Sequence, residues 1–224
     1  MTTAARAPQQ ERSRATQQRL LESTVECLVE FGWSGASTTV IAERAGVSRG
    51  AQLHHYPTRA ALVLAAVEHL AERRAAEIRT EAAAETRIEA EIRTEAVAET
   101  GGRAAAPAGD TERRVDRVID MLAAAFTGPL FVAALEVWVA ARTDPDLKAA
   151  LVPLEARVGR EMHRLAVDLL GADETKAGVR EAVQATLDLL RGLGVANLLS
   201  DDSHRREQLL AAWKRQLATL IREP

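Results

Sequence analysis

The hydrophobic positions near the start of the chain recur with the period of a helix. Leu21, Val25 and Leu28 are spaced i, i+4 and i+7, so they share one face of a helix expected over residues 14–31. Gly32 follows, and a glycine there suits a left-handed helix end. Residues 1–12 show no such period, so we expect them to form a flexible arm.

A short second helix is expected just after this glycine. Ser37 or Thr38 can cap its first turn with a side-chain oxygen, and it should end at Gly46. The apolar side chains that flank the glycine are expected to pack inward against the first helix: Ile41, Ala45 and Val47.

A short third helix and a long fourth helix follow. Ser48 can cap the third helix, which should end near Tyr56 because Pro57 disfavours helical backbone in the residue before it. Thr58 can cap the fourth helix. Two short helices joined by a tight glycine turn form the helix-turn-helix unit, which places its second helix in the major groove of DNA.

The fourth helical pattern contains an internal repeat. The segment EIRTEAAAET at 77–86 recurs as EIRTEAVAET at 91–100, and the offset of 14 residues is close to four helical turns. Two interpretations stay open, a long exposed helical extension and a duplication that frays as a charged linker. The composition of GGRAAAPAG at 101–109 indicates a loop.

The second half of the chain is helical throughout in its pattern. We expect helices at 111–127, 130–142, 146–170, 173–199 and 202–222. The last two carry long apolar stripes, which could close the core or form a four-helix interface with a second copy of the chain. The residues of these stripes that we assign to a dimer interface are Val183, Leu187, Leu190, Leu209, Trp213 and Leu217.

Composition supports an all-α fold and narrows the function. Of the 224 residues 47% are hydrophobic and only 3% aromatic, and alanine, leucine, glutamate and arginine favour helices. The single cysteine, Cys27, lies in an apolar helical stripe, which is typical of a buried residue. Neither a signal peptide nor an apolar run of 18 residues is present, so we expect a cytoplasmic protein that does not enter a membrane.

The distribution of charge fits a DNA-facing N-terminal end. Seven arginines and five glutamates lie in residues 1–60, whereas the whole chain has a formal net charge of −3. Arg49, Gln52 and His54 of the third helix can reach base edges, and hydroxyls at helix starts can hold phosphates. His54 and His55 point about 100° apart on a helix, so they do not form a metal site.

The segments FGWSGAST and TTVIAERAGVSRGAQLHHYPTRAALVLAAV resemble the tetracycline-repressor (TetR) family over residues 14–70. The resemblance implies a helix-turn-helix DNA-binding domain at 13–57. It also implies a larger helical domain at 58–224, with the repeat and loop at 77–110, that dimerises and binds a small-molecule effector. The implied DNA-binding residues are Thr38, Thr39, Ser48, Arg49, Gly50, Ala51, Gln52, His54, His55, Tyr56 and Arg59.

The chain departs from the family pattern in the third helix. The family has an apolar residue followed by tyrosine where this chain has Gln52 and Leu53, so either of the two could face DNA. Their orientation decides which side chains can touch a base.

An aromatic cluster indicates where an effector would bind. Residues 121–144 hold aromatic and methionine side chains in a chain otherwise poor in aromatics, so we expect a mainly apolar ligand pocket there. Plain core packing is the alternative for each of them. The expected ligand-binding residues are Met121, Phe126, Phe131, Leu135, Trp138, Met162 and His163.

These observations predict a homodimeric transcriptional regulator without a cofactor or metal. We expect a repressor of a palindromic double-stranded DNA operator, released by a ligand that shifts the two reading heads through the fourth helix. A DNA-binding regulator or architectural protein without an effector is the alternative. A helical enzyme is disfavoured because no nucleophile–base pair, metal spacing or phosphate loop is present.

Overall fold

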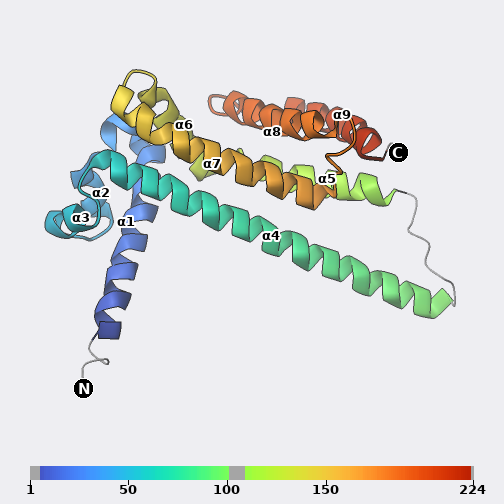
Figure 1. Cartoon of the computed structure of the whole chain (residues 1–224), viewed down its shortest axis with the longest axis horizontal. Coiled ribbons are helices and arrows are strands. Elements are labelled where there is room, and N and C mark those ends of the chain that lie inside the picture. Colours follow the sequence, from blue (N-terminus) through green and yellow to red (C-terminus); the bar gives the residue numbers. More distant parts are fainter. Residues whose placement is uncertain (1–5, 101–108, 223–224) are drawn as a thin grey trace. The chain divides into compact units, whose positions relative to one another are not determined.

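The fold was derived from a computed structural model that describes residues 6–100 and 109–222 (Figure 1). Within these ranges the chain forms helices and connections without a strand, which confirms the expected all-α class. The helices are α1 (Arg6–Gly35), α2 (Thr38–Arg44), α3 (Arg49–His55), α4 (Arg59–Thr100), α5 (Asp110–Ala125), α6 (Pro129–Ala141), α7 (Pro145–Leu170), α8 (Val179–Ala196) and α9 (Ser203–Arg222).

The first helix begins earlier than its apolar period indicated. Residues 6–12, expected to belong to a flexible arm, form the first turns of α1, so that expectation is wrong for them. They lack an apolar face but contain helix-forming residues, and Pro8 is tolerated because it lies in the first turn. The rest of the expected arm, residues 1–5, lies outside the described residues.

The chain packs as two compact units. One comprises Met1–Arg73 with Gly128–Val158, and the other comprises Arg74–Thr127 with Gly159–Pro224. Both α4 and α7 pass from one unit into the other. The unit that contains the first three helices therefore extends beyond residue 57, where the sequence placed a domain boundary.

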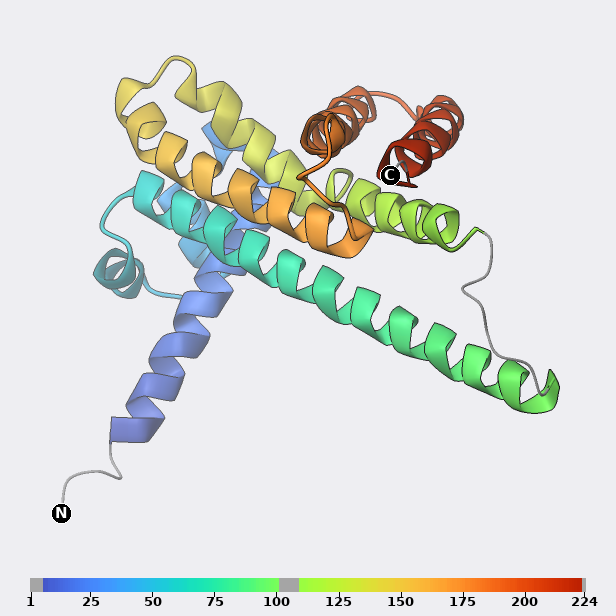
Figure 2. The same ribbon diagram turned by 45° about the vertical axis from the view of Figure 1, so that its right-hand side comes forward.

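The core of the first unit joins the N-terminal helices to α6 and α7. Leu20 and Leu28 of α1, Ile41 of α2 and Leu62 of α4 are completely buried in one cluster with Val137 of α6. Burying one such side chain contributes about 1.5–3 kcal/mol relative to leaving it in water. Figures 1 and 2 show α2 and α3 beside α1, held by this shared core.

The backbone of α1 breaks at a point where it contacts α6. Gly32 adopts φ 64° and ψ −178°, backbone angles open almost only to glycine. Two helical segments meet at Gly32, so its positive φ ends the first of them, as expected, and one more helical turn follows to Gly35. The backbone N–H of Trp33 just after the kink donates to Oε2 of Glu136 on α6 at 2.8 Å.

The second unit is built around contacts among α5, α8 and α9. Figure 1 shows α8 and α9 side by side. Trp213 of α9 donates from Nε1 to Oγ1 of Thr186 on α8 at 2.8 Å, and Nζ of Lys214 lies 2.8 Å from both carboxylate oxygens of Asp120 on α5. These polar contacts fix α9 against both neighbours.

The eighth helix begins later than the expected residue 173. Asp173 instead accepts from the backbone N–H and the hydroxyl of Thr175 at 3.0 and 2.6 Å, an Asx-type turn that competes with helix. Hydrogen bonds from Thr175 hold the pKa of Asp173 below its usual range. Gly178, with φ 80°, then redirects the chain into α8.

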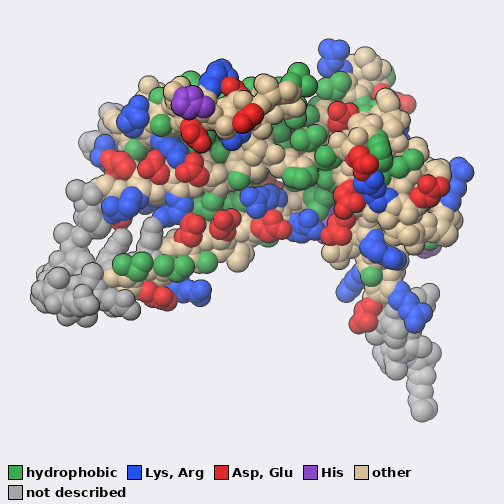
Figure 3. All heavy atoms as spheres, turned by 180° about the vertical axis from the view of Figure 1, so that it is seen from behind, with side chains coloured by type: hydrophobic (Ala, Val, Ile, Leu, Met, Phe, Trp, Pro, Cys, Tyr) green, Lys and Arg blue, Asp and Glu red, His purple; other side chains and the backbone are tan. Residues whose placement is uncertain are grey.

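The two copies of the repeat belong to one continuous α4, which is the extended-helix alternative. Ile78 in the first copy is completely buried and clusters with Met121 and Leu165. In the second copy Ile92 is 61% exposed, and Ile88 between the copies is 52% exposed. Figure 3 shows a row of hydrophobic side chains along this outer part of α4, with charged side chains beside it.

A helix that crosses a membrane must be both long and apolar, and the described helices of this chain were considered for that property only as far as length and hydrophobicity define it. Taken singly, none of them is both long and apolar enough to cross a bilayer. The helices α5 and α6, which are separated by a bend, reach the length and apolar composition of a membrane span only if they are counted together as one segment.

Candidate nucleic-acid interface

Local hydrogen bonds define both short helices of the N-terminal unit. The Oγ of Ser37 accepts from the backbone N–H of Val40 at 3.3 Å and caps α2, which selects Ser37 over Thr38 as the capping residue. The Oγ of Ser48 accepts from the backbone N–H of Ala51 at 3.2 Å and caps α3. These caps satisfy amides that the first helical turn leaves without partners.

The turn between α2 and α3 requires its glycine. Gly46 has φ 63°, and its N–H donates to the carbonyl of Glu43 at 3.1 Å. The N–H of Val47 donates to the carbonyl of Ala42 at 2.9 Å, which completes a Schellman helix end. The turn sets the direction in which α3 leaves α2.

The outward face of α3 is formed by four residues. Arg49, Gly50, Leu53 and His54 are all exposed, and they lie on one side because they are spaced i, i+1, i+4 and i+5. An arginine and a histidine on this face can donate to base edges or phosphates. The sequence left open which of Gln52 and Leu53 faces DNA, and only Gln52 was included among the expected DNA-binding residues.

Gln52 lies on the opposite side of α3. Its side chain has no exposed area, and its Nε2 donates to the backbone carbonyl of Tyr56 at 2.8 Å. The expectation that Gln52 reaches base edges is therefore wrong. Rotation of α3 by its core contacts directs this polar residue inward, where it holds the end of the helix.

The remaining predicted DNA-binding residues differ in exposure. Ser48 and Thr39 are exposed, whereas Thr38, Ala51, His55 and Tyr56 are half-buried. Tyr56 packs against the core of this unit, and burial raises the pKa of its hydroxyl above the ordinary value. Tyr56 thus serves as a packing residue at the end of α3.

Arg59 opens α4 with its guanidinium held over an aromatic ring. Its Cζ lies 4.1 Å from the centre of the Trp33 ring, a cation–π geometry. Nε and Nη2 of Arg59 are buried without a hydrogen-bond partner, and burial lowers the pKa of the guanidinium. Trp33, which the sequence did not single out, therefore positions one of the predicted DNA-binding residues.

Comparisons with known proteins agree with this geometry. Residues 20–66 match the family described as bacterial regulatory proteins, tetR family. The chain is 34% identical over 165 residues to the uncharacterized HTH-type transcriptional regulator Rv2912c of Mycobacterium tuberculosis, covering 74% of this chain and 73% of that protein. The chain belongs to the TetR family.

Two further proteins resemble this TetR-family chain over most of its length. The HTH-type transcriptional regulator CymR of Pseudomonas putida is 28% identical over 208 residues, covering 91% of this chain and 90% of CymR. The crystal structure of FadR from Bacillus subtilis with stearoyl-CoA has a TM-score of 0.59 at 14% identity, covering 91% of this chain and 98% of FadR. The chain is thus a DNA-binding transcriptional regulator of the helix-turn-helix type, and the FadR structure shares its fold over 91% of the chain.

Four of the six residues predicted at the dimer interface of this TetR-family protein lie inside its own chain. Val183, Leu187 and Leu190 of α8 and Leu217 of α9 are buried, so the expectation that they contact a second subunit is wrong. Their stripes face helices of the same chain, as the sequence allowed. Leu209 is exposed and Trp213 is half-buried.

The predicted ligand-binding residues fall into two groups. In the first unit Phe131 and Trp138 of α6 make an edge-to-face contact at 6.2 Å, and Leu135 lies between them on the same helix. In the second unit Met121 belongs to the buried cluster that contains Ile78 and Leu165, and Met162 packs against that cluster. The ligand assignment of all seven residues stays a prediction.

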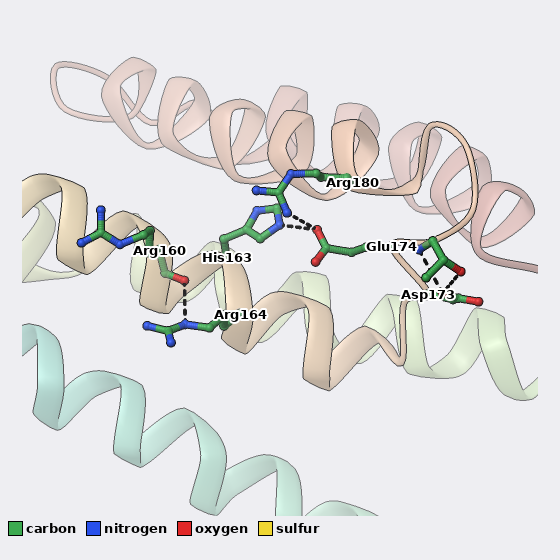
Figure 4. Close-up of polar contacts among 7 residues, drawn as sticks. Arg160, His163, Arg164, Asp173, Glu174 and Arg180 are labelled. Carbon is green, nitrogen blue, oxygen red and sulfur yellow. Dashed lines mark hydrogen bonds and ion pairs between the residues drawn. The ribbon is translucent and has the colours of Figure 1, made fainter.

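Phe126 and His163, also in the second unit, are engaged with charged residues. Phe126 lies 5.8 Å below the guanidinium of Arg191. Nε2 of His163 on α7 lies 2.7 Å from Oε1 of Glu174, and Nη1 of Arg180 on α8 approaches the same oxygen at 3.0 Å (Figure 4). The hydrogen bond to His163 and the charge of Arg180 hold the pKa of Glu174 below its usual range.

Other candidate chemistry finds no support in the described parts of the chain. There, no three His, Cys, Asp or Glu side chains gather as metal ligands. Cys27 is completely buried in the N-terminal core, and burial raises the pKa of its thiol, which makes it a poor nucleophile.

Proposed function

We propose that this TetR-family protein is a homodimeric repressor that reads a palindromic operator with α3 and is released by a mainly apolar small molecule. The observation that carries the proposal is the exposed face of α3, where Arg49 and His54 project from a helix that Ser48 caps and that follows the glycine turn after α2. Because its DNA partner lies in the bacterial cytoplasm, we place the protein there.

Operator binding is tested by fluorescence anisotropy with duplexes selected by the full-length protein from the source genome. We expect Arg49→Ala to weaken binding about 5- to 150-fold, the range for losing one good arginine–base contact. Arg44→Ala is the matched control, because the Arg44 guanidinium pairs with Glu30 and covers the Phe31 ring on α1. Equal affinities of the Arg49 variant and the wild type would remove α3 as the reading helix.

We assign dimerisation to exposed apolar residues at the end of α8 and in the turn after it, in place of the buried stripe. Val195 near the end of α8 is 45% exposed, and Leu199, which lies in the turn that follows α8, is 98% exposed. Leu209 is an exposed apolar residue near the start of α9. Two adjacent helices from each of two chains form a four-helix interface about a two-fold axis, as reading a palindrome requires.

Sedimentation equilibrium tests this surface. We expect the double variant Val195→Glu, Leu199→Glu to sediment as a monomer, because four introduced charges would be buried in each dimer. Val152→Glu, which adds a charge at an exposed valine of α7, should leave the dimer intact. A dimer that persists in the double variant would refute this surface.

A connection from α6 to the reading head supports the effector part of the proposal. Three predicted ligand-binding residues, Phe131, Leu135 and Trp138, lie on α6. Glu136 of the same helix accepts from the N–H of Trp33, whose ring covers the Arg59 guanidinium. A ligand that moves α6 would therefore act on both α1 and the start of α4, in addition to the route along α4.

Removing this connection tests the effector response. FadR shares the fold and binds stearoyl-CoA, so stearoyl-CoA and free stearate are suitable first probes, followed by small aromatic hydrocarbons. For a probe that releases wild-type protein from its operator, Glu136→Leu should need about 5- to 150-fold more probe, the usual range of allosteric coupling. The operator affinity of each variant without probe is measured first and serves as the reference for its release.

Glu72→Leu is the control for that experiment, because Glu72 is an exposed glutamate of α4 in the same unit. If the Glu136 variant responds to the probe as the wild type does, the α6 route is refuted. If no probe alters operator affinity in the wild type, the regulator without an effector becomes the better reading.

A further inference from the structure

Leu53 is the large apolar side chain on the outward face of α3. It is 44% exposed and stands one turn after Arg49 and next to His54. Within α3, which is described in full, every other residue on this face is either charged, polar or a glycine. Water therefore covers an isopropyl group at the centre of the surface that we propose reads DNA.

The rotation of α3 holds Leu53 in this position. Gln52 is fully enclosed, and its Nε2 is tied to the carbonyl of Tyr56 at 2.8 Å. Tyr56 in turn packs on the core of the unit. Neighbouring residues on a helix point about 100° apart, so the anchoring of Gln52 inward directs Leu53 outward.

The chemistry of the major groove has one apolar group for such a side chain. Most of the base edges there carry hydrogen-bond donors and acceptors, and a leucine would displace water from these groups without replacing its hydrogen bonds. The exception is the apolar 5-methyl group of thymine. Gly50 lies one turn before Leu53 and an added Cβ there would meet nothing within 4 Å, so α3 can approach the groove closely at this point.

We propose that Leu53 contacts a thymine methyl group and thereby selects an A·T pair at one position of each operator half-site. This inference rests on the proposed reading of DNA by α3 and adds a specificity residue to it. Arg49 and His54 supply polar contacts beside it, so the side chains on this face would read neighbouring bases by different chemistry.

Thymine-to-uracil replacement tests the contact, because deoxyuridine lacks only the methyl group. With an operator selected by full-length protein from random duplexes, each thymine is replaced singly and the dissociation constant is measured by anisotropy. One thymine in each half-site should weaken wild-type binding about fourfold when replaced, the effect of removing one buried methyl-sized group. Replacement in both half-sites should give about fifteenfold if the two effects add.

Two variants of Leu53 and one control locate the effect. Leu53→Ala and Leu53→Gln should bind the operator with thymine and the operator with deoxyuridine at that position equally. Arg49→Ala should bind both operators more weakly and keep the fourfold difference between them. Both Leu53 variants should fold, since the side chain is exposed, and circular dichroism melts verify this. The proposal is overturned if no thymine replacement weakens wild-type binding, or if the Leu53 variants keep the difference. If the wild-type protein selected no sequence from the random duplexes, the proposed function itself would be contradicted.

Discussion

The two copies of the repeat in α4 have almost the same sequence and opposite environments. Ile78 in the first copy is completely enclosed with Met121 and Leu165, whereas Ile92, its equivalent 14 residues later, is 61% exposed. The helix is continuous through both copies. The same residues in the same secondary structure are thus a core element in one place and a surface in the other.

This difference teaches that burial is a property of neighbours and not of a helical pattern. The first copy runs beside helices of the second unit, and Glu85 at its end pairs with Arg117 of α5 at 3.2 Å. An offset of four turns presents the same face again, but about 21 Å further along the helix axis. The comparison can be tested by equivalent changes in each copy.

The largest expected effect is a truncation in the first copy. Ile78→Ala should lower the free energy of unfolding by about 2–5 kcal/mol, the usual cost of emptying a packed core position. Urea denaturation followed by circular dichroism measures it. Ile92→Ala is the matched control and should change the free energy by less than about 0.5 kcal/mol, as expected for an exposed site. Equal losses would mean that both copies are packed.

A smaller effect is expected from the ion pair at the end of the first copy. Glu85→Gln should cost about 0.2–1 kcal/mol, because both partners are partly exposed and salt screens the attraction. The loss should shrink in 1 M NaCl, which the same denaturation series would show. Glu81→Gln, a change at an exposed glutamate of the same copy, serves as its control. A loss independent of salt would argue against an electrostatic origin.

The smallest effect is expected in a comparison of two deletion proteins, each of which lacks one copy of the repeat. Deleting residues 77–90 would place the second copy where the first one packs, with Ile92 in the position of Ile78 and only Ala83 replaced by valine. Deleting residues 87–100 would leave the first copy in place. The free energies of unfolding of the two proteins should agree within about 0.5 kcal/mol, since Ala83 is exposed and the substitution changes little beyond helix propensity.

Chain length permits both deletions. Glu85 lies beside Arg117, which is seven residues or about 10 Å into α5. The nine residues 101–109 can span up to about 30 Å, so they can connect the shortened α4 to Asp110. If either deletion prevented folding while the other did not, the two copies would differ in a way that their sequences do not explain.

The limits of α2 and α3 and the start of α4 could be predicted closely because they are set locally. Ser37, Ser48 and Thr58 each accept a hydrogen bond from an amide three residues ahead, and Gly46 takes the positive φ that its turn needs. All of these partners lie within a few residues in the sequence. The resemblance to the TetR family rested on the same segment, which is the part that the family match covers.

The parts that could not be predicted depend on contacts distant in sequence. Nothing local shows that Gln52 is enclosed and Leu53 exposed, since the core decides how α3 is rotated. The stripe that contains Leu187 looked equally suited to a core and to a partner subunit. The hydrogen bond between Trp33 and Glu136 joins residues 103 positions apart.

By itself the sequence determined that this protein is helical, where its short helices begin and end, and that it carries a helix-turn-helix unit. Those features follow from backbone hydrogen bonds and allowed angles among residues close together in the chain. Only the tertiary structure decided which face of α3 meets solvent, which apolar stripe is already covered and which copy of the repeat is buried. Those depend on where apolar surface finds a partner, and hydrophobic burial has no preferred direction along the sequence.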